Sequence, residues 1–169
     1  MHRSSALMKK FLAQIEPGEL IRYSFNNSAS LLVLLEKREG TGLFGVITSP
    51  VFEHDMSSYE MALDGHCLSY GHDWFLEEIH GPETVVGGYY LAQNSNLVLD
   101  TQGAVFIFRP ERGQYGFRPT FFSASENTTL QNLDRQLSAP VKEWRIWETE
   151  KHFSDGGVPL FEMKPEPAA

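Results

Sequence analysis

Residues that could bind a metal are concentrated in one part of the chain. Four of the six histidines lie between residues 54 and 80, together with the only cysteine and several carboxylates. Imidazole, thiolate and carboxylate are the usual ligands of zinc, and three of them with a water molecule form a catalytic centre. The hypothesis of a zinc-dependent enzyme names four ligands: His54, His66, His72 and His80. Their spacing matches neither H-E-x-x-H nor a C-x-x-C pair, so a polar loop region with surface histidines is the favoured interpretation.

Cys67 is the second candidate for chemistry. It stands next to His66, and a nucleophilic Cys–His dyad requires only that the two side chains meet in space. A lone cysteine in a short strand is more commonly a small buried apolar residue. The chain has no P-loop and no G-x-S-x-G motif, so functions that depend on these motifs have no support.

Carboxylates are numerous but scattered along the chain. Glu53, Asp55 and Glu60 are one possible acid–base group, and Glu77 with Glu78 is another. Neighbouring residues on one element point in different directions, so the tertiary structure would have to create a catalytic pair. A solvated acidic face is the favoured interpretation.

Aromatic side chains make up 12% of the chain and are dense in its second half. Most of them are expected in the core, whereas an exposed aromatic residue on an acidic surface marks a protein-binding site. The residues expected to contact a protein partner are acidic or aromatic: Asp73, Trp74, Glu77, Glu78 and Tyr89. An aromatic-lined pocket for a small molecule is a third possible function.

The charge balance bears on the kind of partner. The chain has 169 residues, a mass of 19.2 kDa and a formal net charge of −8. An acidic surface disfavours nucleic acid and favours a basic protein. The lone cysteine, the absence of a recognisable secretory signal and the absence of a membrane-length apolar run predict a cytoplasmic protein that does not bind membranes. We expect one domain over residues 1–163 and a frayed tail over residues 164–169.

Apolar periodicity predicts an antiparallel meander in the first half of the chain. Ser5 to Ile15 is expected to form a short amphipathic helix, because its apolar residues have helical spacing. Three strands joined by short turns are then expected: Glu19–Asn26, Ser30–Lys37 and Leu43–Thr48. Helix and strand patterns compete between Ser49 and Gly81, and the sequence leaves this region open.

A second meander is predicted in the other half. Its four expected strands are Thr84–Ala92, Leu97–Asp100, Ala104–Arg109 and Phe117–Ser123. A helix is expected over Ser125–Leu137, because its leucines form one stripe. Val141–Glu150 suits either a helix or a strand. The predicted fold is α+β, with two meanders in a mainly antiparallel sheet, an N-terminal helix and a helix near residues 125–137.

Several features of residues 86–137 occur together in one known superfamily. They are the Gly87-Gly88 pair, Asp100 at the end of a strand, Gly103 in the following turn, and Ser123 leading into the expected helix. In this order they resemble the closing half of SUKH-superfamily domains, although the Leu-Pro and Asn-Gly-Gly features of that family's first half are missing here. The resemblance implies a non-catalytic domain that binds another protein, as in immunity proteins that neutralise a toxin.

The function predicted from the sequence is therefore a non-catalytic, cytoplasmic protein-binding module. Its expected role is to occlude a basic partner such as a toxin, without a cofactor. The alternative is the zinc-dependent enzyme that uses the four histidines.

Overall fold

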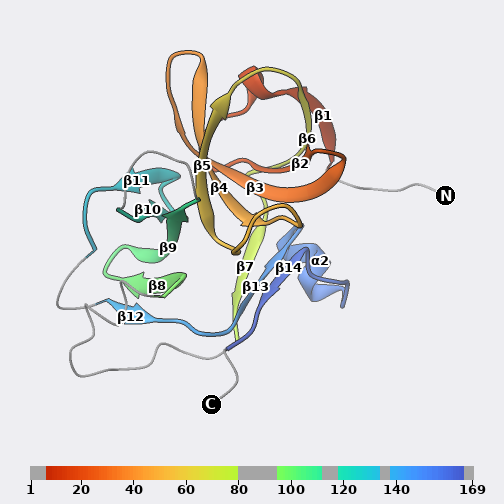
Figure 1. Cartoon of the computed structure of the whole chain (residues 1–169). Helices are drawn as coiled ribbons and strands as arrows, with labels where there is room; N and C mark the ends of the chain where they lie inside the picture. Colours follow the sequence, from red (N-terminus) through yellow and green to blue (C-terminus); the bar gives the residue numbers. More distant parts are fainter. Residues whose placement is uncertain (1–6, 80–94, 112–117, 134–137, 166–169) are drawn as a thin grey trace.

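The computed structural model describes residues 7–79, 95–111, 118–133 and 138–165 (Figure 1). Within these ranges the chain forms one sheet of eleven strands and one of three, with a one-turn 3-10 helix and one short α-helix. The predicted α+β fold with two helices is therefore wrong, because the chain is mainly β-sheet. The strand predicted over Thr84–Ala92 lies outside the described residues.

The first meander follows the apolar pattern of the sequence. Strands β2 (Leu20–Phe25), β3 (Ser28–Lys37) and β4 (Thr41–Thr48) pair antiparallel in chain order, as predicted. Residues 31–35 of β3 are all apolar and all buried, so this strand has a core on each of its two faces.

The region that the sequence left open contains three strands: β5 (Ser57–Ala62), β6 (His66–Gly71) and β7 (Phe75–Glu78). Strand β5 pairs with β4, while β6 returns to pair with β2 on the other side of the meander. The sheet curls strongly as a result (Figure 1). The ring of Phe25 on β2 lies 5.7 Å from that of Tyr59 on β5, although two strands separate β2 from β5.

The N-terminal helix predicted over Ser5–Ile15 is wrong. The described part begins as strand β1 (Met8–Phe11), which pairs antiparallel with β6, and continues as the 3-10 helix η1 (Leu12–Gln14). Leu12 and Ile15 are both fully buried on one side of this turn. A three-residue spacing fits a 3-10 turn, in which residues i and i+3 are aligned, as well as it fits an α-helix.

The concave side of the curled sheet encloses one apolar core. Alternate residues of its strands and the two apolar residues around η1 contribute the buried side chains: Leu12, Ile15, Ile21, Leu32, Leu34, Phe44, Val46 and Cys67. The intervening residues of the same strands face the rest of the molecule, as the two-residue period of a strand requires.

The second meander is formed by β8 (Leu97–Asp100), β9 (Gly103–Pro110) and β10 (Thr120–Ser123), which pair antiparallel in chain order, as predicted. The short strand β12 (Ala139–Pro140) pairs with β8. A parallel pairing between β5 and β9 joins this meander to the curled sheet, with Ser57 opposite Arg109 and Ser58 opposite Pro110.

The helix predicted over Ser125–Leu137 is also wrong in its described part. After β10 the chain turns and returns as strand β11 (Thr128–Leu130), which pairs with β10. The turn contains Asn127 at a positive φ of 52°, and the backbone N–H of Glu126 donates to the hydroxyl of Ser123 at 3.3 Å. Side-chain hydrogen bonds of this kind compete with helix formation, and two threonines then favour a strand.

The ambiguous stretch Val141–Glu150 forms strand β13 (Trp144–Trp147) and the start of helix α2 (Glu150–Ser154). Strand β13 lies between β7 and β14 (Phe161–Met163) in the three-stranded sheet. The two tryptophans of β13 face opposite sides of this sheet.

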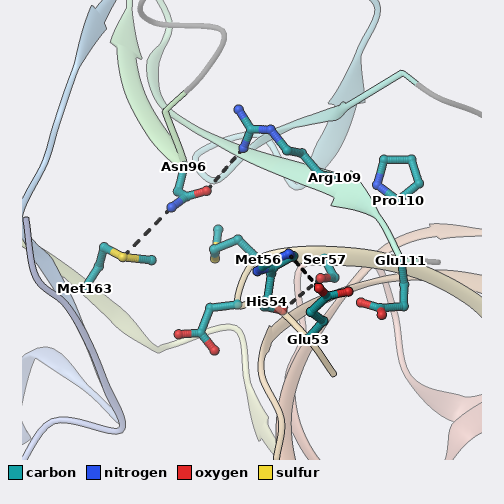
Figure 2. Close-up of a pocket in the computed structure, with 10 residues that line it drawn as sticks. Glu53, His54, Met56, Ser57, Asn96, Arg109, Pro110, Glu111 and Met163 are labelled. Atoms are coloured by element: carbon teal, nitrogen blue, oxygen red, sulfur yellow. Dashed lines mark hydrogen bonds and ion pairs between the residues drawn. The ribbon is translucent and has the colours of Figure 1, made fainter. Parts of the chain in front are cut away.

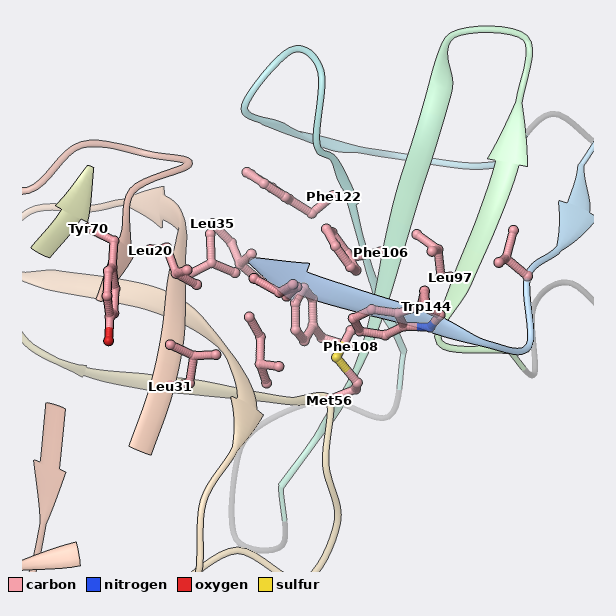
Figure 3. Close-up of a cluster of buried hydrophobic side chains, with 14 residues drawn as sticks. Leu20, Leu31, Leu35, Met56, Tyr70, Leu97, Phe106, Phe108, Phe122 and Trp144 are labelled. Atoms are coloured by element: carbon pink, nitrogen blue, oxygen red, sulfur yellow. The ribbon is translucent and has the colours of Figure 1, made fainter. Parts of the chain in front are cut away.

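A second apolar core joins the three parts of the molecule (Figure 3). The curled sheet contributes its convex-side residues, the second meander contributes Phe106, Phe108 and Phe122, and β13 contributes Trp144. The ring of Phe108 packs directly on β4, where a Cβ on Gly45 would overlap it. Glycine at this position therefore permits the close approach of Phe108 on β9 to the backbone of β4.

Helices long and apolar enough to cross a membrane are absent from the part of the chain that the structure describes.

Candidate functional site

The histidines proposed as zinc ligands occupy separate places. His54 is exposed in the loop before β5, with its Nε2 3.7 Å from a carboxylate oxygen of Glu53. His66 begins β6 and its ring lies 4.3 Å from the ring of Phe11 on β1. Each side chain is thus accounted for by a local contact.

The remaining two histidines add no shared centre within the described residues. His72 follows β6, and its Nε2 lies 2.9 Å from the carbonyl oxygen of Pro17. His80 lies outside the described residues. Across residues 7–79, 95–111, 118–133 and 138–165, no three His, Cys, Asp or Glu side chains are grouped to hold a metal ion. The zinc site therefore stays a prediction without structural support in these ranges.

Cys67 lies in the core of the curled sheet, with 5% of its surface exposed. Burial, together with the nearby charge of Glu19, raises the pKa of the Cys67 thiol to about 11. The thiol is therefore protonated at neutral pH, and a thiolate is the form that reacts as a nucleophile. This environment favours the small buried apolar role over the catalytic one.

The carboxylates considered as an acid–base group do not form one. Glu60 accepts hydrogen bonds from Arg38 and Thr41, each at 3.0 Å, on the far end of β5. Glu53 and Asp55 lie in the loop before β5, where they line the polar cavity described below.

Trp74 and Asp73, two of the five expected partner contacts, lie together in the connection before β7. The indole N–H of Trp74 donates to the carbonyl oxygen of Gly18 at 2.9 Å, and its ring lies 6.0 Å from that of Phe106. Trp74 is therefore half-buried in a structural role, whereas Asp73 is exposed. Tyr89 lies outside the described residues.

Glu77 is engaged inside the three-stranded sheet, while its neighbour Glu78 is exposed. Glu77 accepts a hydrogen bond from the indole N–H of Trp147 at 2.8 Å and lies 3.6 Å from the guanidinium of Arg145. Glu77 and Glu78 are adjacent on β7 and so point to opposite faces of the sheet, and the role of the five expected contacts in binding stays a prediction.

One further motif was missed by reasoning from sequence. Gly40, Gly42 and Gly45 have the spacing G-x-G-x-x-G, which marks a dinucleotide site only where it leads from a strand into a helix. Here the three glycines lie in the β3–β4 turn and in strand β4 itself. The motif therefore forms no phosphate-binding turn.

The outer face of β1, β6 and β2 carries a distinct surface, which we call the β1–β6–β2 patch. In register, Leu68 lies between Lys9 on β1 and Arg22 on β2. These residues line an apolar groove of about 330 Å³ that continues past His66 and Ala29. Within the described residues, neither Lys9 nor Arg22 forms an ion pair with a carboxylate, although Arg22 lies over the ring of Tyr70, 5.9 Å from its centroid.

Large apolar side chains are exposed at the same place. Phe11 and Leu68 have 52% and 39% of their surface exposed, and the ring of Phe11 packs against that of His66 at the groove; Met8, 62% exposed, lies on the other face of β1. Among the strands that the structure describes, β1 is also the terminal strand of the large sheet. An apolar cluster next to an open sheet edge is unfavourable in water unless another surface covers it.

Buried Glu19 anchors β1 to the rest of the curled sheet. Its two carboxylate oxygens accept from Lys10 Nζ at 3.1 Å, from the Ser69 hydroxyl at 2.6 Å and from the backbone N–H of Glu16 at 3.2 Å. Burial acts to raise the pKa of Glu19, but these hydrogen bonds and the charge of Lys10 outweigh it and lower the pKa below 4.5. Every polar atom of the buried carboxylate is satisfied, so this cluster is structural.

A polar cavity of about 510 Å³ lies where β5 and β9 pair (Figure 2). Met56, at a positive φ of 59°, donates its backbone N–H to Ile47 and accepts from the backbone N–H of Arg109. The guanidinium of Arg109 donates to the side-chain oxygen of Asn96 at 3.4 Å. Burial lowers the pKa of the Arg109 guanidinium below its usual range.

The cavity is lined by many polar side chains. Besides Arg109 and Asn96 they include the imidazole of His54 and three carboxylates, Glu53, Asp55 and Glu111. The hydroxyl of Ser57 is buried and donates to the carbonyl oxygen of His54 at 2.9 Å, so no base activates it as a nucleophile.

Reasoning from sequence named His54, Glu53 and Asp55 but missed Asn96, Arg109, Glu111 and Met163. These residues reach the cavity through the parallel pairing of β5 with β9 and through β14. Pairing between strands far apart in the sequence leaves no local signal, so periodicity alone could not find them.

Comparisons of the chain with known protein families, with curated proteins and with solved structures give no match. The resemblance to the SUKH superfamily therefore gains no support from them. The helix that it implies after Ser123 is a turn followed by β11 in the structure.

Proposed function

We propose that this protein is a non-catalytic, cytoplasmic binding module that engages a partner protein through the β1–β6–β2 patch. The observation that carries the proposal is the exposure of two large apolar side chains beside one groove: Leu68, which lines it, and Phe11, whose ring packs against the groove residue His66. Apolar clusters of this kind on a protein surface mark interaction sites.

The charge of the patch defines the partner segment further. Lys9 and Arg22 flank Leu68 in a chain whose formal net charge is −8. A segment that combines apolar with acidic side chains is therefore complementary to the patch. The basic partner predicted from the net charge would bind elsewhere on the surface, and an immunity-type role rests only on the resemblance of residues 86–137.

The proposal is tested by affinity capture from cells that produce the protein. Leu68→Ser and Phe11→Ser alter the patch, while Val51→Ser and Val158→Ser alter apolar residues that are exposed elsewhere, at 45% and 76%. We expect a protein that the wild type and both control variants retain equally and that both patch variants lose. Equal retention by all four variants would place the binding surface elsewhere, and unfolding curves of each variant exclude loss by misfolding.

Elemental analysis of the purified chain distinguishes the metal-dependent enzyme from the binding module. One equivalent of zinc, lost on His72→Ala, would contradict a cofactor-free binding module.

A further inference from the structure

Trp144 carries a buried polar atom that has no partner. The chain contains three tryptophans, and two of them donate their indole N–H: Trp74 to Gly18 and Trp147 to Glu77. Trp144 is fully buried, but its Nε1 finds no acceptor among the residues that the structure describes. A buried donor without a partner is rare and costs about 1–3 kcal/mol, so this atom calls for an explanation.

The indole of Trp144 borders a cavity. Its ring packs 5.4 Å from the ring of Phe106, and Figure 3 shows the indole nitrogen on the side of the ring turned away from Phe108. The cavity has a volume of about 450 Å³ and is lined by residues of the segments around β8, β13 and β14: Ser95, Asn96, Val141, Lys142, Trp144, Met163, Lys164 and Pro165. An acceptor placed in this cavity could satisfy the indole N–H.

The lining of the cavity selects an anion. Two lysines, Lys142 and Lys164, and the amide of Asn96 contribute donors, and no carboxylate is among the lining residues that the structure describes. This is an unusual local composition in a chain with 22 acidic and 14 basic residues. Lysine ammonium groups and an indole N–H together can hold a carboxylate by charge-assisted and neutral hydrogen bonds.

The same cavity has room for an apolar group. Val141, Met163 and Pro165 form apolar parts of its wall, and about 450 Å³ exceeds what an inorganic ion fills and falls within the range of small-molecule sites. We infer that this cavity binds a small organic carboxylate with a short apolar chain, whose oxygen accepts from Trp144 Nε1. This site is independent of the β1–β6–β2 patch and goes beyond the proposed protein-binding function.

The neighbouring polar cavity differs from the Trp144 cavity in the charge of its lining. It shares Asn96 and Met163 with the Trp144 cavity but carries Glu53, Asp55 and Glu111. The amide nitrogen of Asn96 lies 3.9 Å from the sulfur of Met163 at the boundary (Figure 2). An anion is therefore favoured on the lysine side of this boundary and disfavoured on the other.

Nuclear magnetic resonance of the three indole N–H groups tests the inference directly. Uniformly ¹⁵N-labelled full-length protein is titrated with sodium hexanoate, with sodium phosphate and, for ionic strength, with sodium chloride. The Trp144 resonance is assigned by its loss in Trp144→Phe. We expect hexanoate to shift this resonance saturably, while the resonances of Trp74 and Trp147 stay in place.

The lysines are tested by matched charge changes. Lys142→Gln and Lys164→Gln together should raise the half-saturating hexanoate concentration about tenfold, whereas Lys151→Gln, at an exposed lysine of α2, should leave it unchanged. Equal shifts with chloride, or an unchanged titration in the double lysine variant, would overturn the site. A saturable response to phosphate alone would overturn the carboxylate specificity, and no response to any probe would mean that the N–H is satisfied by water.

Discussion

Two buried polar groups, Glu19 in the curled sheet and Trp144 between the sheets, differ in whether the fold provides hydrogen-bond partners for them. The carboxylate of Glu19 accepts hydrogen bonds from three different residues, including a charged lysine. The indole N–H of Trp144 has no acceptor in the described ranges of the chain. Folding alone explains the first group, because burial is compensated by its partners. The second group is left without an acceptor by the described part of the chain, and this difference separates a structural residue from a candidate binding residue.

The packing that buries Trp144 should give the largest effect when it is removed. Phe106 is 1% exposed and its ring contacts those of Trp144 and Trp74. Phe106→Ala should lower the free energy of unfolding by about 3–5 kcal/mol, because it leaves a cavity in the second core. Urea unfolding measures the change, and Leu99→Ala, at a half-buried position on β8, should lower it less. Near-wild-type stability for both variants would contradict the strand assignments of β8 and β9.

The second-largest loss of stability is expected when the carboxylate of Glu19 is removed. Glu19→Ala should lower the free energy of unfolding by about 2–4 kcal/mol, since it leaves the Ser69 hydroxyl and the Glu16 N–H without their acceptor. The matched control is Glu16→Ala, an exposed residue whose ion pair with Lys37 is 3.5 Å long; we expect a change below about 0.5 kcal/mol. Equal effects of the two variants would mean that the Glu19 cluster contributes nothing beyond a surface ion pair.

The pH dependence of stability should reveal the same cluster. The folded-state pKa of Glu19 is lowered from 4.5, so the unfolded chain binds a proton more readily than the folded chain below that pH. The stabilisation is fully present above pH 4.5 and is lost as pH falls through the folded-state pKa. Glu19→Gln should therefore show a shallower loss of stability in this acid range than the wild type. Parallel pH profiles in thermal unfolding would contradict the lowered pKa.

The smallest loss of stability is expected when the indole N–H of Trp144 is removed. Trp144→Phe removes an N–H that has no acceptor among the described residues, so only the loss of ring volume destabilises the protein and the change should cost about 1 kcal/mol or less. Trp147→Phe removes an N–H that donates to Glu77 and should cost about 1–2 kcal/mol. The comparison uses the same chemical change at two sites of one strand. A larger loss at Trp144 than at Trp147 would indicate that its N–H already has an acceptor.

The sequence predicts this fold best where strands alternate and pair with their neighbours. Strands β2, β3, β4, β8 and β9 were found in this way, because their apolar period of two is visible over several residues. The predicted helices fail for an identifiable reason. Leu12 with Ile15 and Leu130 with Leu133 are spaced by three residues, and a 3-10 turn or a strand followed by a turn can bury such pairs as well as an α-helix can.

The candidate sites were predicted less well than the strands. The histidines lie close in sequence, yet β5, β6 and their loops carry His54, His66 and His72 to different places. Trp144 was recognised as an aromatic residue of uncertain secondary structure, but its missing acceptor depends on the positions of β8 and β14. Such a property belongs to the tertiary structure and has no counterpart in a single stretch of sequence.

The parallel pairing of β5 with β9 has a consequence for the order of folding. Strands β2 to β5 are connected by short turns and can pair as soon as neighbouring segments meet. The two residue pairs that join β5 to β9 require closure of a chain segment of about 50 residues, which carries a larger entropic penalty and slows formation. We therefore expect the curled sheet to form early and the polar cavity at the β5–β9 pairing to form late in folding.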